Sequence, residues 1–364
     1  MKIVLSHSER SIMEKTKITV LSSTKWISVF FSVRPFVYTD KKNVKIHFTN
    51  SIDYCFQKDT NKIIILVGKI SSKDDLPTLI GKFRLKYSKI IYFHDKSKPT
   101  INIDIIKLVD KYLIRNAYKD RSLYLGLNGN KNIFHEYCFN KINNENSGFI
   151  NDVQLNQSDL NKLNVAWSLG IGVYPSKKYI TNLAIRMIKW FDFWVIPIKT
   201  ISFGKYPNVK KKDLINSMMS LHNNKKADFQ RTYIFNEFKN DRRFLFEKVS
   251  LRRYNKLIAI SKITISPFGY GEVCFRDYEA ILAKSLLIKP DMSHIETWPD
   301  VYVPFVTYVP VKWDLSDLKD KINYYLYHEE ERNKIVDFAF NHLIHQRAQI
   351  KNRAKEIIDF IIEP

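Results

Sequence analysis

The sequence predicts an α/β protein of two Rossmann-like domains, and three observations support this prediction. The chain has 364 residues, which suits two domains of about 150 to 200 residues better than one. A strand, a helix and another strand follow one another between Lys62 and Phe93. A glycine-containing loop, a helix and an apolar strand follow one another between Ser266 and Ile288. Such alternation is typical of parallel sheets covered by helices.

Short segments rich in β-branched residues predict buried parallel strands in the first half. They are Lys17–Ser22, Lys62–Val67 and Lys89–Phe93, with a helical pattern over Asp75–Ser88. His94 and Asp95 follow the last of these strands, at the edge where such sheets bind ligands. Either side chain could deprotonate a substrate hydroxyl, so both are candidate catalytic residues. The alternative for Asp95 is a turn cap before Pro99.

The rest of the chain is assigned from composition and periodicity. Residues 108–124 predict a substrate-facing surface or a solvated helix, and residues 128–147 predict a loop. The glycines and proline of Trp167–Pro175 indicate a domain edge. The aromatic and basic segment Tyr179–Phe203 suits a membrane interface or a helix between domains. In the second half, the patterns predict a strand and turn over Phe229–Arg243, a helix over Phe244–Val249, a strand over Leu257–Ile265 and one long helix over Glu329–Ile362.

The segment after Ser266 carries residue types that suit an anionic ligand rich in hydroxyl groups. Gly269 and Gly271 allow the backbone to approach a phosphate, and the helix that follows offers unpaired N–H groups. Arg276 adds a forked donor, and Glu279, three residues on, shares its helix face and could accept hydrogen bonds from sugar hydroxyls. Polar residues gather where the next strand ends, and they are Lys289, Asp291, Ser293 and His294.

The run GEVCFRDYEAILAKSLLIKPDMSHIETWPD, from Gly271 to Asp300, resembles the donor-binding half of GT-B glycosyltransferases. The resemblance is to bacterial exostosin-like and spore-protein-like transferases of surface-polysaccharide synthesis, which share the pattern G-x-x-x-x-R-x-x-E-A before an acidic loop. It implies two Rossmann-like domains facing across a cleft, with a C-terminal helix that crosses back to the first. The implied parts are an acceptor-side domain (1–175), an interdomain segment (176–212), a nucleotide-sugar domain (213–340) and the returning helix (341–364).

The resemblance also implies a set of donor-binding residues. Arg231 and Arg243 lie where such enzymes often place a basic residue against phosphate, although a solvated basic face is the alternative for each. Glu272 and Glu279 are seven residues apart, where the commonest retaining pattern has eight, so no retaining mechanism is assigned. The full implied set is Gly271, Glu272, Arg276, Glu279, Lys289, Asp291, His294, Arg231 and Arg243.

Composition restricts the cofactors and the location. Three cysteines without a CxxC spacing disfavour a disulfide scaffold or a zinc site, and His342 and His345 lack a ligand pattern around them. No Asp-x-Asp triplet occurs, so we expect neither a metal nor another cofactor. The first residues lack a signal-peptide pattern, and no apolar run is long enough to span a bilayer. We therefore expect a cytoplasmic protein, peripheral on the inner face of the membrane.

The formal net charge of +22 suits an anionic membrane, a nucleotide diphosphate or nucleic acid, although an AT-rich genome also produces lysine-rich chains. The expected partners are a nucleotide sugar and a saccharide acceptor, free or lipid-linked. No nucleic acid is expected, because no nucleic-acid motif appears. The alternatives are a basic nucleic-acid-binding protein and an inactive GT-B-like interaction protein. The absence of GxGxxG and of a P-loop disfavours dehydrogenases and ATPases.

Overall fold

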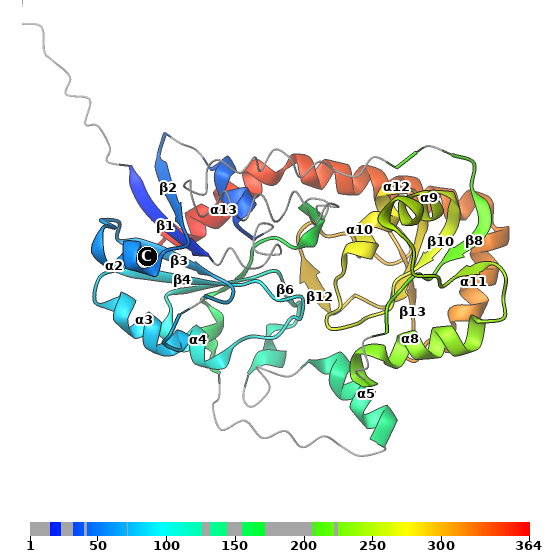
Figure 1. Cartoon of the computed structure of the whole chain (residues 1–364), viewed down its shortest axis with the longest axis horizontal. Coiled ribbons are helices and arrows are strands. Elements are labelled where there is room, and N and C mark those ends of the chain that lie inside the picture. Colours follow the sequence, from blue (N-terminus) through cyan, green and yellow to red (C-terminus); the bar gives the residue numbers. More distant parts are fainter. Residues whose placement is uncertain are drawn as a thin grey trace, which may run out of the picture.

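The computed structural model describes residues 15–22, 32–39, 42–70, 72–125, 132–143, 155–171, 206–207, 209–221 and 225–364, and it shows two α/β domains side by side (Figure 1). The first domain is built on a six-stranded sheet of order β2-β1-β3-β4-β5-β7, in which all neighbours are parallel. The strands are β1 (Thr16–Ser22), β2 (Val44–Thr49), β3 (Ile63–Val67), β4 (Lys89–His94), β5 (Lys111–Ile114) and β7 (Leu163–Val165). The three strands predicted here from β-branched runs are confirmed.

Both faces of the first sheet are buried, which explains its continuous apolar strands. In β3, Ile64 and Leu66 belong to the apolar cluster on one face of the sheet, and Ile65 and Val67 belong to the cluster on the other face. The helical segments of this domain are η1 (Arg34–Tyr38), α2 (Ile52–Gln57), α3 (Leu76–Arg84), α4 (Ile103–Leu108), η2 (Arg121–Tyr124), α5 (Ile133–Asn143), α6 (Gln157–Leu160) and η3 (Leu169–Ile171). The predicted helix after Asp75 is α3, and the Asp75 carboxylate accepts from the backbone N–H of Thr78 at 2.8 Å.

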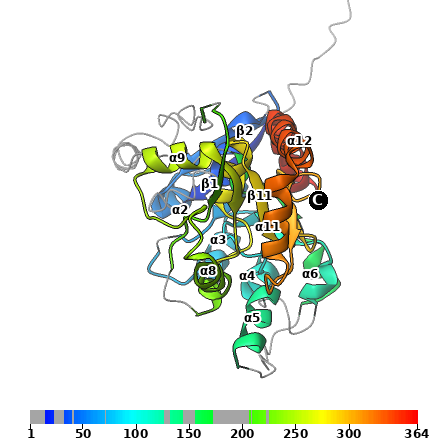
Figure 2. The same ribbon diagram turned by 90° about the vertical axis from the view of Figure 1, so that its right-hand side faces the viewer.

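The second domain contains a five-stranded parallel sheet of order β13-β11-β10-β8-β9. Its strands are β8 (Lys212–Asn216), β9 (Phe244–Leu245), β10 (Ser261–Ile265), β11 (Leu286–Pro290) and β13 (Val309–Val311). Its helices are α8 (Lys225–Phe238), α9 (Leu251–Ile260), α10 (Phe275–Leu282), α11 (Leu318–Tyr327) and α12 (Glu329–Ala348), and Figure 2 shows several of them from the side.

The two sheets share one strand order. Numbered within its own domain, each sheet runs 2-1-3-4-5, and the first sheet adds one more strand. This is a doubly wound order, in which successive strands are added on one side of the first strand and then, from the third strand on, on its other side, so that the strand order reverses. Ligands of such sheets bind at the carboxyl ends of the strands beside that reversal. In the second domain, the reversal lies between β8 and β10.

The domains are joined by more than the segment between them. The strand β6 (Asn116–Tyr118) of the first domain pairs antiparallel with β12 (Ile295–Thr297) of the second, and both lie between the domains in Figure 1. One apolar cluster also contains residues of both domains, among them Tyr118 and Ile295. The two domains therefore share part of their core.

The C-terminal helix returns to the first domain. The long helix α12 runs along the second domain, and α13 (Ile350–Ile362) then packs on the first sheet, so that the C-terminus lies on the first domain (Figure 1). Ile357, Ile358 and Ile361 belong to the same buried cluster as Ile65 and Val67 of β3. The first sheet thus has one of its faces covered by the end of the chain.

Several predicted elements are wrong. Residues 128–147 contain the helix α5, whose Phe134 packs on Phe268 and Trp313 of the second domain. Residues 108–124 form β5, β6 and η2 instead of a solvated helix. The predicted strand over Phe229–Arg243 belongs largely to the helix α8, whose Ile234 and Phe238 face the second sheet at helical spacing.

Three further assignments differ in detail. The segment Phe244–Val249 begins with the strand β9, and the predicted strand over Leu257–Ile265 starts only at Ser261, because α9 continues to Ile260. The predicted single helix over Glu329–Ile362 is broken at Gln349. The segment Tyr179–Phe203 lies outside the described residues. None of the helices in the described ranges is both long and apolar enough to cross a membrane.

Candidate functional site

A cavity of about 420 Å³ opens at the carboxyl edge of the second sheet, beside the reversal between β8 and β10. Three parts of the chain form it: the segment after β8, the segment from β9 into the first turn of α9, and the first turns of α10, with Arg231 added from α8. Its lining residues are Met218, Met219, Ser220, Arg231, Glu247, Lys248, Val249, Leu251, Tyr254, Cys274, Phe275, Arg276 and Glu279. Of the residues predicted to bind a donor, Arg231, Arg276 and Glu279 are thus brought together.

Two guanidinium groups lie on the wall of this cavity. Arg276 donates from Nη2 to the carbonyl oxygen of Met218 at 3.2 Å, while its Nε and Nη1 are buried without a hydrogen-bond partner. Arg231 donates from Nη1 to the carbonyl oxygen of Ser220 at 2.7 Å. Burial lowers the pKa of Arg231, and the nearby charge of Arg276 lowers it further. Because buried N–H groups are rarely left unpaired, the pair is suited to an anion with several oxygen atoms.

A carboxylate lies one turn along α10 from Arg276. Glu279 accepts a hydrogen bond from the Tyr254 hydroxyl, with 2.8 Å between Oη and Oε2. Burial raises the pKa of Glu279, whereas the Tyr254 hydrogen bond and the charge of Arg276 lower it. The wall of the cavity therefore offers donors for an anion and an acceptor for hydroxyl groups, separated by about 4.5 Å along the helix axis.

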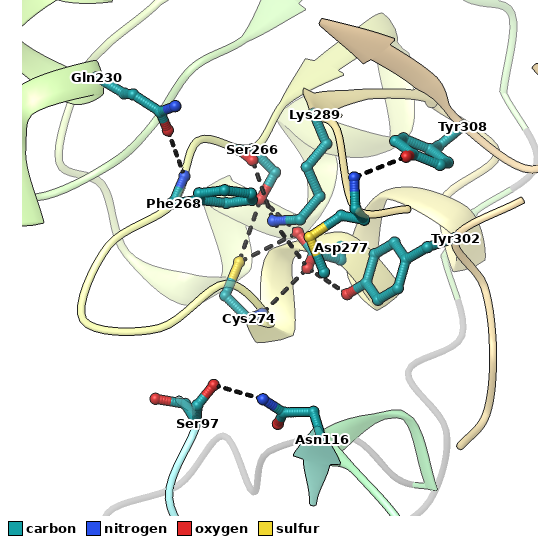
Figure 3. A network of polar contacts seen from close by, with 11 residues as sticks. Ser97, Asn116, Gln230, Ser266, Phe268, Cys274, Asp277, Lys289, Tyr302 and Tyr308 are labelled. Atoms are coloured by element: carbon teal, nitrogen blue, oxygen red, sulfur yellow. Dashed lines mark hydrogen bonds and ion pairs between the residues drawn. The ribbon is translucent and has the colours of Figure 1, made fainter. Parts of the chain in front are cut away.

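A buried polar network fixes the start of α10 (Figure 3). The Asp277 carboxylate accepts from the Tyr302 hydroxyl at 2.6 Å and from the backbone N–H of Cys274 at 3.0 Å, and it also binds the Ser266 hydroxyl. Lys289, which is fully buried, lies 3.2 Å from the same carboxylate. Lys289 was predicted to bind a donor, but its ammonium group is enclosed in this network and does not line the cavity.

The loop before α10 faces the first domain. A Cβ atom added to Gly271 would lie 2.5 Å from the carbonyl oxygen of Ser97, so a glycine allows the two backbones to approach. The buried Glu272 accepts from the Asn132 side chain at 2.5 Å, and its Oε2 has no hydrogen-bond partner. Burial raises the pKa of Glu272 to about 7. Gly271 and Glu272, predicted to bind a donor, therefore lie at the contact between the domains and not on the cavity wall.

The other predicted donor residues also lie away from the cavity. Asp291 accepts from the backbone and hydroxyl of Ser293, which makes it a turn residue. His294 packs against the Trp313 ring with 5.0 Å between centroids, and burial lowers its pKa to about 4. Arg243 precedes β9, at the opposite edge of the sheet, and is held by Asp241 at 2.6 Å.

The two candidate catalytic residues of the first domain differ in accessibility. His94 is buried, its Nδ1 lies 2.8 Å from the Tyr112 hydroxyl, and burial lowers its pKa to about 3. Asp95 keeps 15% of its side chain exposed at the carboxyl end of β4, where it lies 3.8 Å from Arg115. It packs closely on Gly68, whose φ of +62° suits a glycine. Of the two side chains, Asp95 is the more exposed to solvent.

The sequence-based reasoning missed Tyr254 and Asp277. Tyr254 belongs to the first turn of α9, where the sequence pattern predicts no helix, so no helix face places its hydroxyl. Asp277 stands three residues after Cys274, and an acidic residue at that spacing is a sequence signal for a helix start. No cluster of potential metal ligands occurs in the part of the chain that the structure describes.

No family model and no curated protein matches the sequence. Similar solved structures include a glycosyltransferase from Rickettsia africae (12% identity, 96% of this chain and 99% of that chain covered, TM-score 0.48). Another is HepE from Anabaena in complex with UDP and glucose (8% identity, 94% of this chain and 99% of that chain covered, TM-score 0.45). A third is T4 phage β-glucosyltransferase (12% identity, 95% of this chain and 100% of that chain covered, TM-score 0.44). With TM-scores below 0.5, these similarities carry no argument about activity.

The chain's own architecture defines its fold. Two doubly wound sheets have the same strand order, and loops after β4 and β10, at the carboxyl edges of the two sheets, touch at Ser97 and Gly271. The C-terminal helix α13 covers the first sheet after leaving the second domain. The chain has the GT-B fold.

Proposed function

We propose that this protein is a glycosyltransferase that moves a sugar from a nucleotide-activated donor to a saccharide acceptor. The observation that carries the proposal is the cavity at the strand reversal of the second sheet, where Arg276 and Arg231 stand beside Glu279. Two guanidinium groups match a diphosphate, and a carboxylate one helical turn away matches the hydroxyl groups of a ribose. A nucleoside diphosphate presents both groups within one small molecule.

The proposed mechanism uses charge stabilisation. As the bond between the sugar and the diphosphate breaks, negative charge grows on the leaving phosphate oxygens, and preorganised donors at that place lower the barrier. The Nε and Nη1 atoms of Arg276 are buried and unpaired, so they are available for that charge without first breaking hydrogen bonds. The proposal assigns this role to the side chains and needs no metal ion.

The acceptor is proposed to bind at the carboxyl edge of the first sheet. Asp95 is partly exposed there and could take the proton of the attacking hydroxyl. From the sequence resemblance we also propose a role in bacterial surface-polysaccharide synthesis (O-antigen, capsule or lipopolysaccharide), with an acceptor that is lipid-linked. The net charge of +22 supports attraction to an anionic membrane surface.

Thermal unfolding with a panel of nucleotides tests the proposal. UDP, GDP, CMP and dTDP are added at millimolar concentration, with and without EDTA, and a ligand that binds the folded state raises the midpoint. We expect one nucleotide to act selectively and to resist EDTA. Loss of the shift in EDTA would contradict metal independence. No shift with any nucleotide would contradict the transferase and favour an inactive GT-B-like interaction protein, while steeply salt-dependent DNA or RNA binding would favour a nucleic-acid-binding protein.

A further inference from the structure

We propose that Tyr254 is a positioning residue that fixes the Glu279 carboxylate for a ribose diol and so makes the site prefer ribonucleotides to 2′-deoxyribonucleotides. This inference rests on the proposed function, because it concerns the same cavity. It assigns a task to a residue of α9 that the sequence did not single out.

The geometry starts from the hydrogen bond between the two side chains. The Tyr254 hydroxyl lies 2.8 Å from Oε2 of Glu279, and both residues line the cavity. A carboxylate on a glutamate rotates freely about its last side-chain bond unless something holds it, because that torsion has a broad energy minimum. Tyr254 restrains the rotation of the carboxylate, because the tyrosine side chain has only two torsions and its hydroxyl donates to a single carboxylate oxygen.

Tyr254 is suited to remain the donor of this hydrogen bond. Burial raises the pKa of Tyr254 far above its ordinary value, and the charge of Glu279 raises it further. The hydroxyl therefore keeps its proton at any physiological pH. Because an oxygen of a carboxylate can accept two hydrogen bonds, Oε2 has capacity left after binding Tyr254. Among the described residues, none donates a hydrogen bond to Oε1 in this structure.

The position of Arg276 relates this carboxylate to a nucleotide. Arg276 and Glu279 are three residues apart on α10, which separates them by about 4.5 Å along the helix axis. If the guanidinium binds phosphate, the carboxylate lies close enough to meet the sugar that carries the phosphate. Two neighbouring hydroxyls would use both oxygens of a fixed carboxylate, whereas a 2′-deoxyribose offers one hydroxyl fewer. One oxygen of the carboxylate then lacks its hydroxyl partner, and the lost hydrogen bond lowers affinity.

The experiment compares each ribonucleotide with its 2′-deoxy form. Calorimetric titration of UDP and dUDP, GDP and dGDP, and CMP and dCMP gives a ratio of dissociation constants for each variant. We expect wild type to prefer the ribose form of its nucleotide about tenfold, and Tyr254→Phe to reduce that ratio roughly threefold to tenfold, as one hydrogen bond allows. Glu279→Gln should bring the ratio near one. Tyr324→Phe is the matched control, because it removes a similar hydrogen bond, 3.0 Å to Glu331, from an exposed surface.

The possible outcomes distinguish a failure of the role proposed for Tyr254 from a failure of the proposed glycosyltransferase function. If Tyr254→Phe weakens both sugar forms equally, or leaves the ratio unchanged, Tyr254 does not position Glu279 for a diol. Equal binding of both forms by wild type would also overturn the inference and leave the nucleotide site intact. If no nucleotide binds wild type at millimolar concentration, the proposed function itself fails, and the inference fails with it.

Discussion

Arg276 is the side chain on which the nucleotide proposal depends most directly. Arg276→Ala removes a guanidinium with two buried, unpaired nitrogens. We expect nucleotide binding to weaken by about 1.5 to 3 kcal/mol, the range for a hydrogen bond to a charged group. Isothermal titration measures the change. Arg243→Ala is the control, because Arg243 lies at the opposite edge of the sheet beside Asp241, and equal losses in both variants would contradict the assignment of the site.

Asp95 allows binding and catalysis to be separated. Asp95→Asn keeps the shape of the side chain but removes the base, so we expect turnover to fall at least about a hundredfold while nucleotide affinity stays unchanged. Sugar transfer and nucleotide titration are measured on the same preparation. Asp104→Asn, at an exposed position of α4, should leave both values unchanged. Full activity of Asp95→Asn would show that Asp95 only caps its turn.

Residues that line the cavity could be predicted from the sequence where their spacing along one helix is enough to put them on the same face. Arg276 and Glu279 share a helix face because they are three residues apart, and the structure keeps that relation. Lys289 could not be placed in this way, because its direction depends on which face of β11 is buried and on the partner Asp277. Glu272 depends on a contact with Asn132, 140 residues away in sequence, which no local pattern reveals.

At the level of elements, β1, β3 and β4 of the first sheet could be predicted because they are rich in apolar, β-branched residues. Segments such as Ile63–Val67 are buried on both faces, so composition identifies them. The second domain was harder because its helices carry many polar residues. In α8, only a few positions such as Ile234 and Phe238 meet the sheet, while aromatic residues such as Tyr233 and Phe235 are exposed. The aromatic and β-branched residues of that segment therefore predict a strand when composition alone is considered.

The network at the start of α10 leads to a prediction about stability. Lys289→Met removes one partner of a buried ion pair and leaves Asp277 without its compensating charge. We expect the free energy of unfolding to fall by about 3 to 5 kcal/mol, as measured by urea unfolding. Lys284→Met is the matched control, because Lys284 binds Asp337 at 2.8 Å on an exposed surface, where such a pair contributes less than about 1 kcal/mol. Similar losses in the two variants would contradict a role for burial.

At the scale of the whole molecule, the two domains meet through polar as well as apolar contacts. The loop from Gly269 to Cys274 belongs to the second domain, yet Gly271 touches Ser97 and Glu272 binds Asn132 of the first. This loop also leads directly into α10, where Arg276 lines the cavity. A nucleotide bound at Arg276 would therefore lie only a few residues along the chain from the contact between the domains.

Glu272 gives this contact a pH dependence. Burial raises the pKa of the Glu272 carboxyl group in the folded state to about 7, above the ordinary value of 4.5, so the folded chain keeps the group neutral up to a higher pH than the unfolded chain does. Below pH 4.5 the group is protonated in both the folded and the unfolded chain. As pH rises toward 7, only the unfolded chain loses the proton, so the folded state loses stability across this window and regains none above it.

Glu272→Gln should remove this loss. The amide oxygen can still accept from Asn132, and no charge is buried at any pH, so we expect the variant to exceed wild type by roughly 3 kcal/mol at pH 8 and by much less at pH 5. Urea unfolding at the two pH values measures the difference. Glu237→Gln, at a side chain that is 40% exposed, should show no such change between the two pH values. A Glu272→Gln variant that is destabilised equally at both would mean that the carboxylate is ionised and held by Lys98 or Lys289, whose charges lower its pKa.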